Sequence, residues 1–230
     1  LIGSSSGFKA IDGVTQGLQD EDLIVIAGRP SMGKTSLAMN IAENIAKNDD
    51  GCVAVFSLEM SSQSLTSRML ASMAGISQSN VKTGNLTDRQ WEKLIQQAKK
   101  LEEMNIFIDD TPNISPMEIR AKSRRLAKQY RKQGGVKLVV VDYIQLMQMP
   151  GRTENRVNEL SEISRALKYL AKEINAPVIV LSQLNRAVEQ RPNKRPQMSD
   201  LRDSGAIEQD ADLIFMLYRD FVYNKNEEWK

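Results

Sequence analysis

The stretch GRPSMGKTS, Gly28 to Ser36, constrains the fold more than any other feature of this 230-residue chain. It matches the pattern Gly-x-x-x-x-Gly-Lys-Ser/Thr, in which backbone N–H groups cradle the phosphates of a nucleoside triphosphate. The lysine of the pattern, here Lys34, meets the β- and γ-phosphates, and the following hydroxyl, here Thr35, meets Mg²⁺. Because the pattern works between a strand and a helix, it predicts an α/β domain with a nucleotide site.

The stretch, called the phosphate loop below, lies in the context that its chemistry requires. An apolar run at residues 23–27 precedes it, and a predicted helix at residues 34–46 follows it. The amino terminus of that helix adds a favourable partial charge for phosphate. We therefore expect the whole loop to bind the nucleotide: Gly28, Arg29, Pro30, Ser31, Met32, Gly33, Lys34, Thr35 and Ser36.

Short apolar runs alternate with longer amphipathic segments, which is typical of a mostly parallel, twisted sheet with helices on both faces. The runs are rich in Val, Ile and Leu without alternation, which indicates strands buried on both sides. We expect strands at residues 23–27, 53–58, 106–108, 137–141, 177–181 and 213–218. We expect helices at residues 34–46, 62–74, 87–103, 115–132 and 158–174, the fourth with Ser115 as its N-cap. Because no interdomain linker is visible, residues 1–230 are predicted to form one domain.

Composition excludes several classes of protein. The net charge of +2 gives no whole-molecule attraction to nucleic acid, so any such contact needs a local patch. The chain has no histidine, which rules out a Ser-His-Asp triad and makes a His/Cys zinc site implausible. The one cysteine, Cys52, cannot form an internal disulfide, which fits a reducing cytosol. No apolar run is long enough to cross a bilayer and no signal peptide is visible, so we expect a cytoplasmic protein without membrane contact.

Acidic side chains at the ends of two predicted strands are candidates for hydrolysis chemistry. Asp142 follows the run KLVVV, where a carboxylate can hold Mg²⁺ or its waters; the alternative is a residue that merely caps the strand. Hydrolysis also needs a group that deprotonates the attacking water, and without histidine this group is expected to be an acid. Glu59 ends the strand after the helix of the phosphate loop, although a surface glutamate fits its spacing equally well.

Polar residues elsewhere raise the question of further contacts. Gln183 ends another buried strand, where an amide can bind a γ-phosphate and report its loss to the next loop, although spacing alone favours a structural amide. Residues 148–156 and 185–205 are predicted loops, and the four basic residues in the stretch QRPNKRPQMSDLR of the second can touch a phosphate backbone. The eight basic residues between Arg120 and Lys137 accompany an apolar stripe, so we expect them on the solvated side of a covering helix.

Five motifs together resemble those of the DnaB-type bacterial replicative DNA helicases, in the family's order. They are GRPSMGKTS, FSLEM, VVVDYIQLM, LSQLNR and SDLRDSGAIEQDAD. The opening SSSGFKAIDGVTQGL is also similar to the lead-in of the family's RecA-like motor domain, so the match covers nearly the whole chain. The phosphate loop is generic, but SLEM with DYIQLM and SGAIEQDAD is highly specific.

The resemblance implies a RecA-like P-loop ATPase that uses ATP and Mg²⁺ to translocate 5′→3′ on single-stranded DNA and to unwind duplex at the replication fork. It implies Lys34 and Thr35 at the phosphates and Mg²⁺, with Lys34 needed for catalysis. It further implies Glu59 as the catalytic base, Asp142 as the Walker B aspartate and Gln183 as the γ-phosphate sensor.

The resemblance also implies a homohexamer whose central channel holds the DNA. It places Arg202, Asp203 and Gly205 in the loop that tracks the DNA backbone; Asp203 stands where members commonly have Glu, which shortens any contact there. Primase and a helicase loader are the implied partners. The family's N-terminal collar domain and its Lys-x-Arg finger, which reaches into the neighbouring subunit's site, are expected to lie outside these residues.

Two alternatives stay open at this point. A RecA/RadA-type recombinase ATPase shares the fold and the phosphate loop, but the stretch SGAIEQDAD favours the helicase. A nucleotide-gated assembly module would bind ATP and scarcely turn it over. The presence of both Glu59 and Asp142 argues against such a module.

Overall fold

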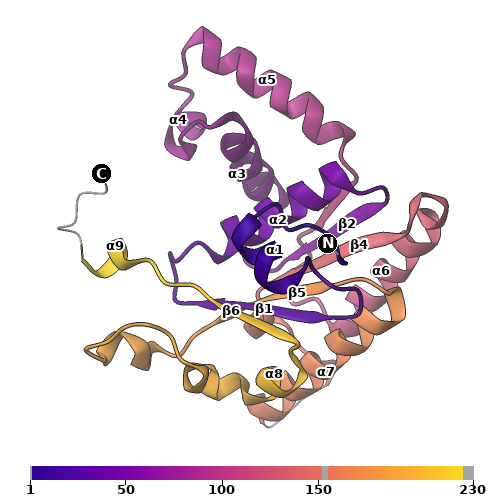
Figure 1. Cartoon of the computed structure of the whole chain (residues 1–230), viewed down its shortest axis with the longest axis vertical. Coiled ribbons are helices and arrows are strands. Elements are labelled where there is room, and N and C mark those ends of the chain that lie inside the picture. The colour runs from indigo at the N-terminus through magenta and orange to yellow at the C-terminus, as the bar shows by residue number, and fades with distance from the viewer. Residues whose placement is uncertain (1, 152–154, 225–230) are drawn as a thin grey trace.

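The computed structural model describes residues 2–151 and 155–224, apart from the side chains of residues 202–204. Its centre is a six-stranded parallel sheet in the order β3-β2-β4-β5-β1-β6 (Figure 1). The strands are β1 (Leu23–Gly28), β2 (Cys52–Ser57), β3 (Ile106–Asp109), β4 (Val136–Asp142), β5 (Val178–Gln183) and β6 (Leu213–Met216). They confirm the expected α/β fold and differ from the predicted bounds by at most two residues.

Helices cover both faces of this sheet. They are α1 (Lys9–Thr15), α2 (Lys34–Asn48), α3 (Ser62–Ala74), α4 (Gln78–Thr83), α5 (Asp88–Glu103), α6 (Pro116–Gln129), α7 (Arg156–Ile174), α8 (Gly205–Asp210) and α9 (Asp220–Tyr223). Short 3-10 helices are η1 (Arg131–Gln133), η2 (Ile144–Leu146), η3 (Arg186–Gln190) and η4 (Met198–Ser204). Helix α2 packs on one face, and α6 and α7 pack on the other (Figure 1). None of the helices within the described ranges is long and apolar enough to span a bilayer.

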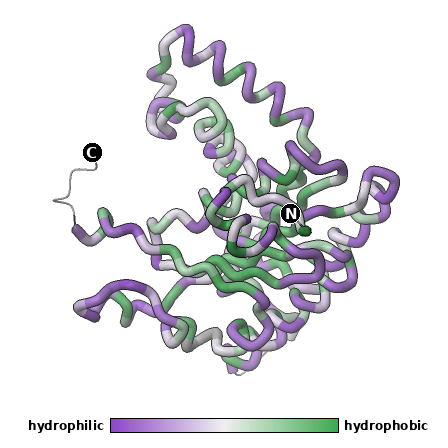
Figure 2. Tube along the Cα trace, viewed as in Figure 1, coloured by the Kyte–Doolittle hydropathy of each residue, from purple (hydrophilic) through white to green (hydrophobic). Residues whose placement is uncertain are grey.

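Alternate residues of each inner strand supply two apolar cores on opposite faces. In β1, Ile24 and Ile26 belong to the core under α2, whereas Leu23 and Val25 belong to the core under α6 and α7. This double burial explains why the strands read as continuous apolar runs. The edge strands β3 and β6 are only partly buried. Figure 2 shows the apolar sheet at the centre and polar helices and loops around it.

Local capping chemistry sets the start of α6. The Ser115 side chain accepts a hydrogen bond from the backbone N–H of Glu118, and the Glu118 carboxylate accepts one from the Ser115 N–H at 3.0 Å. This capping box and Pro116 at the first turn agree with the predicted start. The helix ends earlier than predicted, at Gln129, because the chain tightens into η1.

The basic residues around α6 lie as predicted, on the outer side of a covering helix. Ile119 is buried, and Leu126 packs against the same core. Arg120 and Arg124 both form ion pairs with Glu173 of α7, at 2.6 and 3.1 Å. The four helices that the sequence did not predict, α1, α4, α8 and α9, have seven residues or fewer. Such short segments cannot show a helical period over two turns.

Candidate nucleotide-binding site

The register of the sheet brings four strand ends to one place, at the carboxyl edge. Gly28 of β1 pairs with Gln183 of β5, and Ser57 of β2 pairs with Asp142 of β4. Ligands of open α/β sheets bind at this edge. Backbone pairing alone therefore brings together segments that lie far apart in the sequence.

The phosphate loop connects β1 to α2 at this edge. Gly33 has φ 94°, a left-handed conformation that side-chain-bearing residues rarely adopt, and α2 begins at the next residue. The first N–H groups of α2 lack helical partners and are free to bind an anion. The Lys34 ammonium donates to the Gly28 carbonyl at 2.9 Å, which places its positive charge within the loop.

A pocket of about 390 Å³ lies over the phosphate loop. The predicted catalytic residues Lys34, Glu59 and Gln183 all line it. The full lining is Pro30, Ser31, Gly33, Lys34, Thr35, Ser36, Glu59, Met60, Arg68, Gln183 and Arg219. Most of the predicted nucleotide-binding residues therefore line one cavity together with one acid, Glu59, and one amide, Gln183, from the ends of other strands.

Two residues of the phosphate loop turn their side chains away from this pocket. Arg29 is buried and donates instead to the carbonyl of Leu184 at 2.8 Å. Met32 is 5% exposed, and its sulfur accepts a hydrogen bond from the backbone N–H of Arg219 at 3.3 Å. Because of these contacts, neither side chain is directed at the nucleotide, and only their backbones are candidates for contact with it.

Thr35 and Asp142, the predicted metal-binding pair, contact each other directly. The Thr35 hydroxyl donates to Asp142 Oδ2 at 2.9 Å. Asp142 is 2% exposed, and its Oδ1 is buried with no hydrogen-bond partner among the described residues. Burial raises the pKa of Asp142, the Thr35 hydrogen bond opposes this, and the charge of Glu59 adds to the rise.

This pair fits Mg²⁺. A buried carboxylate oxygen without a partner is energetically costly, and a cation removes that cost. Mg²⁺ prefers oxygen ligands and is usually held by one or two protein groups together with substrate phosphates. The hydroxyl of Thr35 and the carboxylate of Asp142 supply such a donor set at the mouth of the phosphate loop.

Glu59 lies in a tight turn directly after β2. The Ser57 hydroxyl donates to the Met60 carbonyl at 2.8 Å and accepts from the Met60 N–H at 3.2 Å, which fixes the turn. Glu59 thereby reaches the pocket with its carboxylate close enough to act on its charged neighbours. Burial lowers the pKa of Lys34, whereas Asp142 and Glu59 counteract this by stabilising the ammonium.

Sequence analysis assigned no specific role to Gln145, which holds the sensor candidate Gln183 in place. The Gln145 amide nitrogen donates to the Ser182 hydroxyl at 2.9 Å and to the Gln183 carbonyl at 3.2 Å. Its amide oxygen accepts from the Gln183 N–H at 3.2 Å. Gln145 therefore fixes the end of β5 from η2, the segment that follows Asp142. The signals available in the sequence were its position three residues after the candidate metal ligand and its place in the motif VVVDYIQLM.

Two arginines of the pocket were also missed. Arg68 comes from α3, and its Nε is buried without a hydrogen-bond partner in the described part of the chain. Arg219 follows β6. Together with Lys34 they give the pocket an excess of positive charge, which suits a polyphosphate. No local pattern marks Arg68, because the apolar face of α3 dominates that stretch; Arg219 was detectable as a charged residue at a strand end.

Two of the predicted DNA-contact residues, Arg202 and Asp203, belong to the segment between β5 and α8, residues 184–204, which we call the β5–α8 loop. Gly205 follows it and is exposed at the start of α8. The side chains of Arg202 and Asp203 lie outside the described residues. The segment was predicted to be irregular, but the structure corrects this: η3 and η4 occupy most of it.

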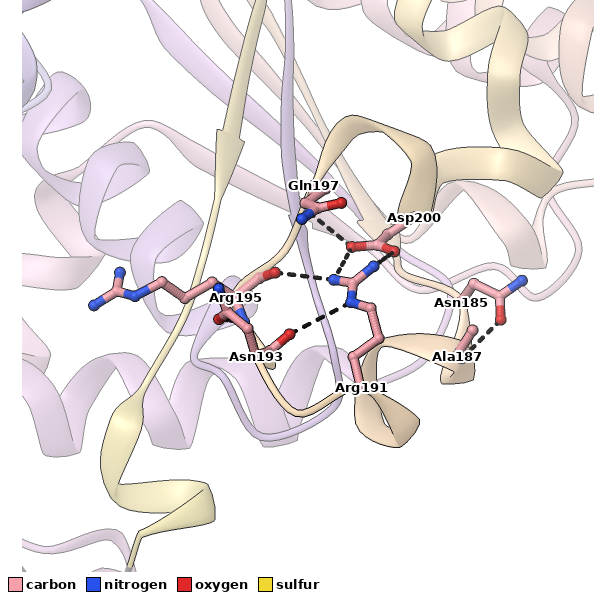
Figure 3. Close-up of polar contacts among 7 residues, drawn as sticks. All are labelled: Asn185, Ala187, Arg191, Asn193, Arg195, Gln197 and Asp200. Atoms are coloured by element: carbon pink, nitrogen blue, oxygen red, sulfur yellow. Dashed lines mark hydrogen bonds and ion pairs between the residues drawn. The ribbon is translucent and has the colours of Figure 1, made fainter.

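Two basic residues of the β5–α8 loop, Arg191 and Arg195, have partners of their own. Arg191 donates to both carboxylate oxygens of Asp200, at 2.6 and 2.9 Å, and to the Arg195 carbonyl (Figure 3). The Arg195 guanidinium lies 4.8 Å from the centre of the Tyr218 ring. The expectation of four basic side chains facing a phosphate backbone therefore fails for Arg191, whose charge is used inside the loop.

Comparison with known proteins decides the family. Residues 3–230 match the family described as the DnaB-like helicase C terminal domain. The chain belongs to this family. It is 52% identical over 231 residues to the replicative DNA helicase DnaB of Geobacillus stearothermophilus, and 50% identical to the replicative DNA helicase DnaC of Bacillus subtilis. All of this chain is covered in both cases, and it spans about half the length (50%) of each relative.

Solved structures agree with this assignment. One, described as an ATPase domain, superposes with a TM-score of 0.91 and 40% identity, covering 98% of this chain and 79% of the other. Another, of a DnaB-like replicative helicase and its interactions with primase, has a TM-score of 0.92 and 40% identity, covering 99% of this chain and 54% of the other. The RecA-like fold and the family expected from the motifs are therefore confirmed.

Proposed function

We propose that this chain is the ATP-hydrolysing motor domain of a cytoplasmic replicative DNA helicase, with residues 1–230 forming one RecA-like domain. The proposal rests on one observation: four groups of functional residues meet at one edge of the sheet. The phosphate loop, the Thr35–Asp142 pair, Glu59 and Gln183 surround or adjoin one pocket. Membership of the DnaB-like family supports the assignment to DNA replication.

Five residues in or beside the pocket have roles in ATP hydrolysis that follow from their chemistry. The Lys34 ammonium neutralises charge on the β- and γ-phosphates. Thr35 and Asp142 would hold Mg²⁺, which when bound offsets the charge that develops on the phosphate oxygens. Glu59 accepts a proton from the attacking water, and Gln183 donates its amide to the γ-phosphate.

The β5–α8 loop carries the proposed contact with single-stranded DNA. Arg202 and Asp203 lie at its end, Gly205 follows it, and the loop begins directly after Gln183. Gln183, the proposed γ-phosphate contact, is therefore joined by a single peptide bond to the first residue of the loop, so a movement of Gln183 would be passed directly to the loop. We further propose a homohexamer that encloses the DNA and moves 5′→3′, with primase and a helicase loader as partners of the full natural protein.

The test is steady-state ATP hydrolysis by the full natural protein, with and without single-stranded DNA, alongside sedimentation with and without ATP. We expect hydrolysis that DNA stimulates, a sixfold assembly, and separation of a forked duplex. Exchange of homologous strands without separation of a fork would favour the recombinase alternative. Tight ATP binding with negligible turnover would instead identify a nucleotide-gated assembly module.

A further inference from the structure

Arg29 belongs to the phosphate loop, yet its side chain is attached to the β5–α8 loop. It is 9% exposed. Its guanidinium donates to the carbonyl of Leu184 at 2.8 Å and to the carboxylate of Glu189 at 3.1 Å. The first residue of the β5–α8 loop and the last turn of η3 are therefore fastened to one side chain next to the nucleotide pocket.

The geometry of this attachment is rigid. A guanidinium is planar and presents its donors in a fixed fork, so binding two acceptors at once defines the orientation of both. The Arg29 side chain is 10% exposed and that of Glu189 is 46% exposed, so solvent screens the ion pair only from the Glu189 side. The Leu184 N–H also approaches the Gly28 carbonyl at 3.4 Å, so backbone and side chain fasten the same two segments.

The far part of the β5–α8 loop is joined to this attached part by a second set of contacts. The Asn185 N–H donates to the Asp200 carbonyl at 3.0 Å. The Asp200 carboxylate accepts two hydrogen bonds from Arg191 and a third, at 2.7 Å, from the Gln197 N–H (Figure 3). Burial alone would raise the pKa of Asp200, but these hydrogen bonds outweigh it and hold the pKa below its usual value.

These contacts form one continuous series from Arg29 in the phosphate loop to Asp200. Asp200 lies two residues before Arg202 in the sequence. We propose that Arg29 is a positioning residue that transmits the state of the nucleotide pocket to the β5–α8 loop, through Glu189 and the Arg191–Asp200 pair. This inference rests on the proposed function, because it concerns coupling between bound ATP and bound DNA. The proposed route of coupling starts at the phosphate loop and is separate from the one that starts at the Gln183 side chain.

Coupling of this kind has a defined thermodynamic measure. If nucleotide binding changes DNA affinity by some factor, DNA binding must change nucleotide affinity by the same factor. Contacts between the two sites are established as carriers of coupling only when a variant changes that factor. The measurement is therefore the dissociation constant of a fluorescent single-stranded oligonucleotide, with a non-hydrolysable ATP analogue and with ADP.

The decisive variant is Glu189→Gln in the full natural protein, which removes the charge of the pair and keeps its shape. We expect the ratio of the two DNA dissociation constants to fall about three- to tenfold, within the range known for residues along coupling routes. Binding of the analogue without DNA should be unchanged, because Glu189 does not line the pocket. Glu173→Gln is the matched control, since it removes an ion-paired carboxylate on α7.

Arg29→Lys provides the second arm, because lysine keeps the charge and loses the fork. If Arg29 acts through Glu189, the double variant should lower the ratio no further than Arg29→Lys alone. An unchanged ratio in Glu189→Gln, or an equal fall in Glu173→Gln, would overturn the inference. If the wild-type protein itself shows no difference between analogue and ADP, the proposed function fails and this inference falls with it.

Discussion

The nucleotide edge of the sheet and the β5–α8 loop are held in place by different forces. All six residues of β1 are buried, and backbone ladders to β5 and β6 fix where the phosphate loop begins. The β5–α8 loop instead rests on side-chain hydrogen bonds and on three buried apolar residues, Leu184, Val188 and Leu201. Regions with few buried apolar contacts open at lower free energy than sheet cores. The structure thus places a chemical site set by the buried sheet beside a segment that depends more on side-chain contacts.

The strongest test of the rigid region is Lys34→Ala, which removes the ammonium from the phosphate loop. We expect ATP hydrolysis to fall by about 10³-fold or more, the scale for a charged group that stabilises a transferring phosphoryl group. The far-ultraviolet dichroism should not change, because the sheet does not depend on this side chain. Lys47→Ala removes a cation from the other end of α2 and serves as the control. Near-normal hydrolysis in Lys34→Ala would show that the pocket is not the site of turnover.

Glu59→Gln separates chemistry from binding within the same region. The amide keeps the shape of the side chain but cannot accept a proton, so we expect kcat to fall about 10²-fold. Binding of ATP with Mg²⁺, measured by equilibrium titration, should persist. A variant that lost ATP affinity and kept kcat would make Glu59 a structural residue; Glu92→Gln on the exposed side of α5 controls for the change of charge.

Residues that depend on backbone pairing could be predicted from the sequence. The ends of β1, β2, β4 and β5 follow from apolar runs, and the register of parallel strands then collects their last residues at one edge. Thr35, which follows the end of β1, thereby comes within 2.9 Å of Asp142 at the end of β4, while the roles of both residues stay predictions.

Contacts between distant side chains could not be predicted. Arg29 was expected to bind the nucleotide because it lies in the phosphate loop and is positively charged. Its guanidinium instead binds Leu184 and Glu189, which lie far along the chain. The sequence of the β5–α8 loop likewise suggests exposed positive charges, but in the structure Arg191 is bound to Asp200 within the loop. Such pairings depend on how irregular segments fold back, which periodicity does not encode.

Asp200→Asn tests whether the β5–α8 loop is held by its ion pair. The measurement is the rate of cleavage by trypsin within residues 184–200. Arg191 and Arg195 are each followed by proline, which blocks trypsin, so Arg186 and Lys194 are the cleavable sites in this range. Loss of the carboxylate charge removes roughly 1.5 kcal/mol, the low end for hydrogen bonds to charged groups, so cleavage should become about tenfold faster. Glu173→Gln should leave the cleavage rate at these sites unchanged. Equal rates for Asp200→Asn and wild type would mean that apolar anchoring alone holds the loop.

The smallest expected effect belongs to Arg202→Ala. If Arg202 contacts a DNA phosphate, its loss should weaken binding of single strands about equally for all base sequences. The slope of log affinity against log salt should fall by roughly one unit, because one fewer counterion is released. The assembled protein is needed, and Arg165→Ala on the exposed side of α7 is the control. An unaltered affinity and slope would remove Arg202 from the DNA contact.

Amide hydrogen exchange of the full natural protein, with an ATP analogue and with ADP, tests most directly whether the loop responds to the nucleotide while the sheet stays rigid. We predict that amides of β1 and β5 exchange slowly in both states, because they lie in the buried ladder. Amides of residues 185–200 should exchange at different rates in the two states. Identical exchange in this segment, in a protein that still hydrolyses ATP faster on DNA, would contradict the account.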